Sequence, residues 1–101
     1  MSAQGTPLRI EDSAPDSVRV SGSLTFANAA SALDAISAAV ARDGRRALDL
    51  AGVQHSDSAG LACVLAVLAQ AAEQGRSLTV RNLPEGMRLL ATVCEVEGLM
   101  S

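Results

Sequence analysis

Apolar and polar residues alternate strictly in several short segments of the chain, and this period of two predicts half-buried strands. Residues 8–11 and 18–24 show it, and the segment between them contains Pro15, which favours a turn; we therefore expect an antiparallel hairpin. Apolar strands are also predicted over residues 46–50 and 78–81.

Between these strands the period changes to that of a helix. A first helix is predicted to end at Asp43-Gly44 with the glycine as its C-cap, a second to run from about 58 to 74 and stop before Gly75, and a third to cover 84–94, with Pro84 in its first turn. The first apolar stripe comprises Phe26, Ala29, Ala30, Leu33, Ile36 and Val40, and the third comprises Met87, Leu90, Ala91 and Cys94.

The order strand, strand, helix, strand, helix, strand, helix predicts an α/β fold. We expect a mixed sheet of four strands or slightly more with an N-terminal antiparallel hairpin, later strands joined in parallel by right-handed crossovers, and three helices. The absence of repeats and linkers indicates one domain over residues 8–101, preceded by a flexible tail at 1–7.

Composition narrows the function classes. Trp and Tyr are absent and Phe26 is the only aromatic residue, so the core must be built from aliphatic side chains and alanine. The net charge is −3 with no basic cluster beyond Arg45-Arg46, which argues against a nucleic-acid partner. The chain has no lysine, which excludes a Walker-type phosphate loop and Schiff-base chemistry.

The sequence predicts no membrane segment, metal site or cofactor. No apolar run reaches the roughly 20 residues of a membrane helix, and the polar N-terminus lacks the features of a signal peptide, so we expect a cytoplasmic protein. Cys63 and Cys94 lie in apolar helical patterns, and their separation does not match metal-ligand spacing; we expect buried, reduced thiols.

The most informative segment is the corner between the third strand and the second helix. After the polar loop Gln54-His55-Ser56, the pair Asp57-Ser58 opens the helix. Backbone N–H groups at a helix N-terminus are unpaired and carry partial positive charge, so a hydroxyl there can be phosphorylated or can contact a partner. Asp57 or Ser58 can equally serve as an ordinary N-cap, and both roles are compatible.

The helix that follows is apolar on every side, since residues 59–69 include no polar side chain. Either it is central and flanked by the other two helices, or it exposes a patch near its start, where Gly60, Ala62 and Ala66 would admit another backbone. A catalytic triad from residues 55–58 is rejected, because triad groups must converge from different segments and no second histidine exists.

The order of elements, the corner Asp57-Ser58-Ala59-Gly60-Leu61, and the closing helix followed by Val96-Glu97-Gly98-Leu99 resemble a STAS domain over about residues 8–100. This resemblance implies a non-enzymatic domain that docks onto another protein, and it favours an exposed edge on the second helix. In the anti-sigma-factor antagonist branch of the family, the serine matching Ser58 is the phosphorylation site.

A second branch, the MlaB subunits of the Mla phospholipid-transport system, fits better. These proteins bind the cytoplasmic ATPase of an ABC transporter and have a very short C-terminus, and antagonists usually carry a second hydroxyl residue where Ala59 stands; this chain stops at Met100-Ser101. The resemblance implies an accessory subunit held at the inner membrane by its ATPase, or alternatively an antagonist phosphorylated on Ser58 by a serine kinase. The expected contact residues are Gln54, His55, Ser56, Asp57, Ser58, Ala59, Gly60, Leu61 and Ala62.

Overall fold

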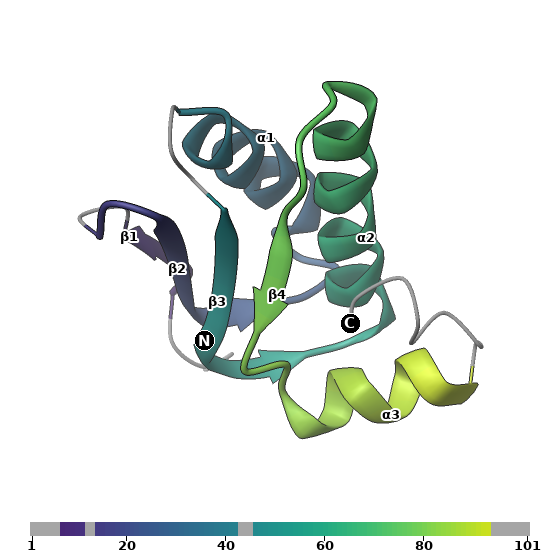
Figure 1. Ribbon diagram of the computed structural model, residues 1–101. Coiled ribbons are helices and arrows are strands. Elements are labelled where there is room, and N and C mark those ends of the chain that lie inside the picture. Colours follow the sequence, from purple (N-terminus) through teal and green to yellow (C-terminus); the bar gives the residue numbers. More distant parts are fainter. Residues whose placement is uncertain (1–6, 12–13, 43–45, 94–101) are drawn as a thin grey trace.

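The structure is a computed structural model that describes residues 7–11, 14–42 and 46–93. Its elements follow the predicted order: β1 (Arg9–Glu11), β2 (Ser17–Leu24), α1 (Ala29–Val40), β3 (Ala47–Ser56), α2 (Ser58–Glu73), β4 (Thr79–Arg81) and α3 (Glu85–Val93). The four strands form one sheet in the order β1-β2-β3-β4 (Figure 1). β1 pairs with β2 antiparallel, and the other two pairings are parallel, as predicted.

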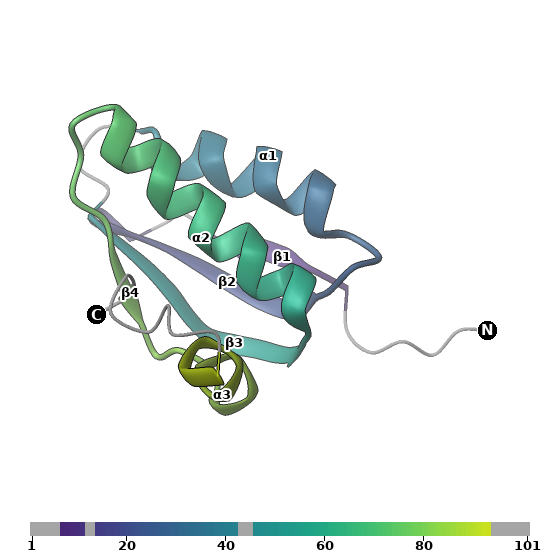
Figure 2. The same ribbon diagram turned by 90° about the vertical axis from the view of Figure 1, so that its right-hand side faces the viewer.

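The two crossover helices lie side by side on one face of the sheet (Figure 2). Each parallel strand is added next to the previous one in the same direction, so right-handed crossovers place α1 and α2 on the same side. The third helix lies below α2 in the view of Figure 1 and contacts it. The sheet therefore has one face covered by two helices and one face turned away from them.

The core lies between the sheet and these helices and contains no aromatic residue in the described part of the chain. Alternate residues of β2 and β3 point into it, with Val18, Val20, Leu48 and Leu50 fully buried. The helices contribute mainly small or branched side chains, and α3 contributes Met87 and Ala91. Cys63 belongs to this core and is a free thiol whose pKa is raised by burial, as expected for an inert cysteine.

The third strand is longer than the sequence pattern predicted, because it runs to Ser56 and not to residue 50. Its polar second half, predicted as a loop, pairs with β2 as far as Leu24↔Ser56. The register shifts twice along this pair, and Gly22, between the shifts, has a positive φ of 91°. Tertiary pairing thus overrides the local pattern, and Gly22 has the bulge role that a glycine in a strand indicates.

The observed C-terminal ends of α1 and α2 can be compared with the ends predicted from the sequence. The first helix ends at Val40, where Arg76 donates hydrogen bonds to the carbonyls of Val40 and Arg42; the predicted cap at 43–44 lies outside the described residues. The second ends as predicted, with Gly75 at φ 73° and the Arg76 N–H donating to the Ala71 carbonyl, 2.9 Å. Cys94, the segment 96–101 and most of the tail at 1–7 also fall outside the described residues.

Close packing fixes the start of α2 against the end of β2. Gly60, in the first turn of the helix, is buried beneath Leu24, and a Cβ added to it would overlap the Leu24 carbonyl oxygen. The sequence pattern predicted that Gly60 admits the backbone of a partner. This prediction is wrong in one respect, because the backbone that approaches is the chain's own.

Candidate functional site

Asp57 organises the corner between β3 and α2. Its backbone is extended, and its Oδ1 accepts a hydrogen bond from the Gly60 N–H at 3.1 Å, so Asp57 is the N-cap of the helix. Its Oδ2 accepts a second bond, at 3.0 Å, from the N–H of Phe26, which lies 31 residues earlier in the chain. One carboxylate therefore both caps α2 and fixes the loop that connects β2 to α1.

These hydrogen bonds favour the charged form of the carboxylate. The bond from the Phe26 N–H is the largest cause, and together with the N–H groups of the first helical turn it lowers the pKa of Asp57 below its usual value. Ser58 is the first residue of α2 and is exposed, so its hydroxyl is accessible beside this charge. Of the two candidate caps, the structure assigns capping to Asp57.

Replacing Asp57 by Ala should destabilise the domain by about 1 kcal/mol, since both hydrogen bonds disappear. The pKa of Asp57 is lowered in the fold, so its contribution is complete at neutral pH and is lost as pH falls through that lowered value. Urea unfolding followed by circular dichroism should thus give a smaller difference between wild type and Asp57→Ala in acid. An exposed carboxylate on α1 serves as control: Asp34→Ala should change the unfolding free energy by less than about 0.5 kcal/mol. A difference that grows on acidification would contradict the assignment.

Phe26 stands on this corner as an exposed aromatic ring. It was predicted on the apolar stripe of the first helix, but α1 begins at Ala29 and the side chain of Phe26 is 85% exposed. The loop between β2 and α1, which carries Phe26, is ordered by hydrogen bonds. The Asn28 side chain accepts one from the Thr25 N–H at 3.0 Å and donates one to the Ser23 carbonyl at 2.9 Å. Burying the loop in a partner would therefore cost little conformational entropy, whereas leaving the ring in water is unfavourable.

The other predicted contact residues divide into accessible and buried ones. Gln54, His55 and Ala62 are exposed, and Ser56, Asp57 and Ala59 are half-buried. Gly60 and Leu61 are buried inside the domain, so they do not offer contact surface, which corrects their assignment. The reason is that these two residues lie on the side of α2 that packs on the sheet. Contact roles for the accessible residues stay predictions.

A shallow apolar groove runs between α1 and α2, with a volume of about 350 Å³. It is lined by Ala29, Ala30, Leu33, Ala59, Ala62, Cys63 and Ala66. α2 was predicted either to be flanked by the other two helices or to expose a patch near its start. It contacts both other helices and still exposes Ala62, so each prediction is correct in part. The only charged side chains on α1 and α2 are the acidic residues Asp34 and Glu73.

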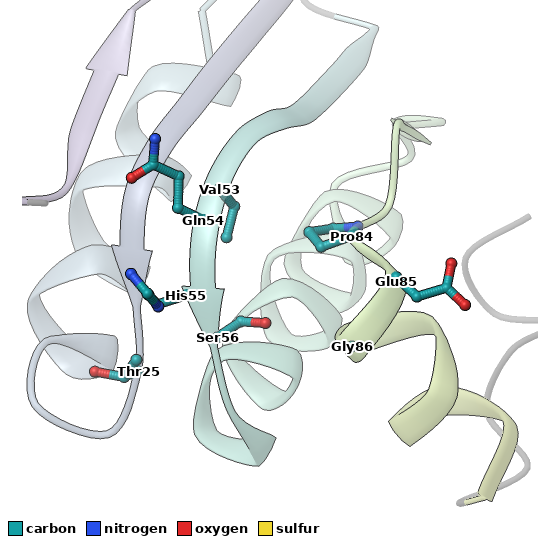
Figure 3. Close-up of a pocket in the computed structure, with 8 residues that line it drawn as sticks. All are labelled: Thr25, Val53, Gln54, His55, Ser56, Pro84, Glu85 and Gly86. Carbon is teal, nitrogen blue, oxygen red and sulfur yellow. The ribbon is translucent and has the colours of Figure 1, made fainter. Parts of the chain in front are cut away.

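A second hollow, of about 490 Å³, lies where β3 ends and α3 begins (Figure 3). It is lined by Thr25, Val53, Gln54, His55, Ser56, Pro84, Glu85 and Gly86. The imidazole of His55 and the carboxylate of Glu85 point away from each other, and the carboxylate of Asp57 is held by backbone N–H groups. These groups do not converge on a common point, which an acid–base or nucleophilic centre requires.

Within residues 7–11, 14–42 and 46–93, no three His, Cys, Asp or Glu side chains are grouped so that they could hold a metal ion. The same part of the chain includes no helix long and apolar enough to cross a membrane.

Comparisons with known proteins agree with this geometry. A protein-family model described as "Mlab, STAS domain" matches residues 9–101. The fold is similar to the solved structure of the anti-sigma factor antagonist SpoIIAA in its unphosphorylated form, with a TM-score of 0.68 at 15% identity, over 94% of this chain and 86% of that one. At this identity the likeness concerns the fold alone. No curated protein matches the chain.

Proposed function

The chain belongs to the STAS domain family, and from this premise we propose that it is a non-enzymatic accessory subunit that docks onto the cytoplasmic ATPase of an ABC transporter for phospholipids. The family description names Mlab, which favours this branch. The protein would then act in the cytoplasm, at the inner membrane through its partner. A domain without catalytic groups acts by favouring one conformation or assembly state of what it binds.

The observation that carries the proposal is that the Asp57 carboxylate holds the backbone of Phe26, whose ring is exposed, at the start of α2, where Ser58 is also exposed. Buried aromatic anchors contribute much of the affinity of protein interfaces, and a preorganised loop reduces the cost of binding. We define the docking surface as Phe26, Ser58 and the groove between α1 and α2. Because the groove is lined by apolar side chains, this surface suits a partner segment with apolar side chains.

The proposal is tested by purifying the tagged protein from its native cells and identifying what accompanies it. Recovery of an ABC-type ATPase with its permease supports the transporter role. Recovery of a small serine kinase supports the alternative, an anti-sigma-factor antagonist, which the fold likeness to SpoIIAA and the accessible hydroxyl of Ser58 favour. In that case phosphate on Ser58 should appear with the kinase and ATP.

Replacing Ser58 by Glu should weaken docking about tenfold or more, because a charge at the contact must lose its hydration. The fold should tolerate the change, since an acidic side chain in the first turn of a helix is favourable. Ser77, which is exposed and lies beyond the other end of α2, offers a matched control. Titration calorimetry with the purified partner should show normal affinity for Ser77→Glu. Equal affinities for both variants would remove Ser58 from the contact.

A further inference from the structure

The face of the sheet turned away from α1 and α2 carries one row of alternating charge. Glu11 pairs with Arg19 across β1 and β2, Arg19 with Asp49 across β2 and β3, and Asp49 with Arg81 across β3 and β4. Their neighbours in sequence, such as Val18 and Leu48, are buried in the core, so side-chain alternation directs the row to the opposite face. Across the whole sheet the signs read minus, plus, minus, plus.

The centre of this row is held in place. The Oδ1 atom of Asp49 accepts hydrogen bonds from the Asn82 side chain at 3.0 Å and from the Ala51 N–H at 2.9 Å. The Asn82 bond is the largest cause that holds the pKa of Asp49 below its usual value, and the charges of Arg19 and Arg81 contribute. This carboxylate is thus charged and oriented at neutral pH.

In the next register row Ser21 pairs with Arg9 of β1 and with Gly52 of β3, so the small side chains lie where β2 meets β3. A Cβ on Gly52 would overlap the Cβ of Ser21. Ala51 is exposed beside them. These small side chains, at the centre of the sheet, allow another surface to approach closely there.

A row with this order of signs is complementary to itself when reversed. A two-fold axis parallel to the strands, passing between β2 and β3, reverses the row and places Arg19 of one copy opposite Asp49 of the other, and Glu11 opposite Arg81. A two-fold axis running across the strands would instead place each residue opposite itself, with like charges facing. The charges therefore select one of the two face-to-face arrangements.

We infer that this face of the sheet, on which Glu11, Arg19 and Arg81 are exposed, binds a second copy of the chain about a two-fold axis parallel to the strands, with the row Glu11, Arg19, Asp49 and Arg81 pairing with itself. A second copy of the chain is the partner that charge complementarity indicates, since every charge of the row then faces an opposite charge. The groove between α1 and α2 lies on the other side of the sheet from this face, so self-association leaves the groove available (Figure 2). Exposed ion pairs are individually weak and screened by salt, so the dimer is transient and forms at low ionic strength.

The same row also stabilises the sheet within one chain through cross-strand pairs, and the test must separate the two effects. Arg19→Glu alone places like charges opposite each other in the dimer, and so does Asp49→Arg alone. When the two variants are mixed, every facing pair becomes opposite again. This recovery cannot come from cross-strand pairs within one chain, because each chain in the mixture still carries its own single substitution.

Native mass spectrometry at low ionic strength distinguishes the species, because the two variants differ in mass. We expect wild-type dimers, a loss of about tenfold or more in dimer affinity for each variant alone, and recovery of a one-to-one hybrid on mixing. Glu11→Arg with Arg81→Glu, at the edges of the row, gives the same rescue if the first pair fails to fold. Wild type that stays monomeric, dimers that survive the single changes, or mixtures that form no hybrid would each overturn the inference.

Discussion

Gly60→Ala should lower the free energy of unfolding by about 3 kcal/mol. This is the largest effect that we expect from adding or removing one methyl group in this chain. The added Cβ would overlap the carbonyl oxygen of Leu24. This carbonyl belongs to the last residue of β2, which pairs with Ser56 of β3, so neither side can move without breaking the sheet or shifting α2. A domain of this size has a stability of only about 5–15 kcal/mol, so a substantial part of it would be lost.

A second helical glycine provides the matched control. Gly86, in the first turn of α3, has nothing within 4 Å of the position a Cβ would take, so Gly86→Ala should stabilise by about 0.5–1 kcal/mol through better helix propensity. Because the chain lacks Trp and Tyr, urea unfolding is followed by far-ultraviolet circular dichroism. If the two variants shift the midpoint alike, the packing of α2 on β2 is not as described.

Phe26→Ala should weaken partner binding by about 10- to 100-fold while leaving the unfolding free energy within about 0.5 kcal/mol of wild type. The ring is 85% exposed in the free domain, so its removal costs the fold little. It lies on the loop that the Asp57 carboxylate holds, so it meets the partner without first being ordered. This separation of binding from stability distinguishes an anchor residue from a structural one.

Calorimetric titration of the partner measures this effect. Val93, 79% exposed on α3, is the control, and Val93→Ala should bind normally. Phe26→Trp adds a single fluorophore to a chain without Trp or Tyr, and its emission should shift to shorter wavelength when the partner covers it. An unchanged emission spectrum in a verified complex would place the interface elsewhere.

Periodicity predicted the order of all the described elements, because alternation and helical spacing report which side of an element is buried. The direction of each strand pairing followed from that order, since a short turn gives an antiparallel pair and a helical crossover a parallel one. It failed for the second half of β3. There Gln54 and His55 read as a loop, yet the strand continues because β2 lies beside it and the register shifts accommodate the extra residues. Such pairing depends on residues distant in sequence.

Only the part of the candidate site that depends on neighbouring residues could be predicted from the sequence. Asp57 and Ser58 are recognisable as a helix start from local chemistry alone. Phe26 also fits a helical stripe in the sequence, but α1 begins only at Ala29, and hydrogen bonds to the Asn28 side chain and the Asp57 carboxylate hold residues 25 and 26 in a loop. The one available signal was that Phe26 is the only aromatic residue of the sequence, among apolar residues that are otherwise aliphatic.

The short outer strands of the sheet limit how this protein can aggregate. In the described part of the chain both edges are strands of three residues, β1 and β4, each carrying a charged residue of the row. Short, charged edges give an incoming strand little to pair with, so open-ended growth of intermolecular sheet is disfavoured. We therefore expect concentrated solutions to grow no intermolecular sheet through β1 or β4, a property of value to anyone who prepares this domain for crystals or spectroscopy.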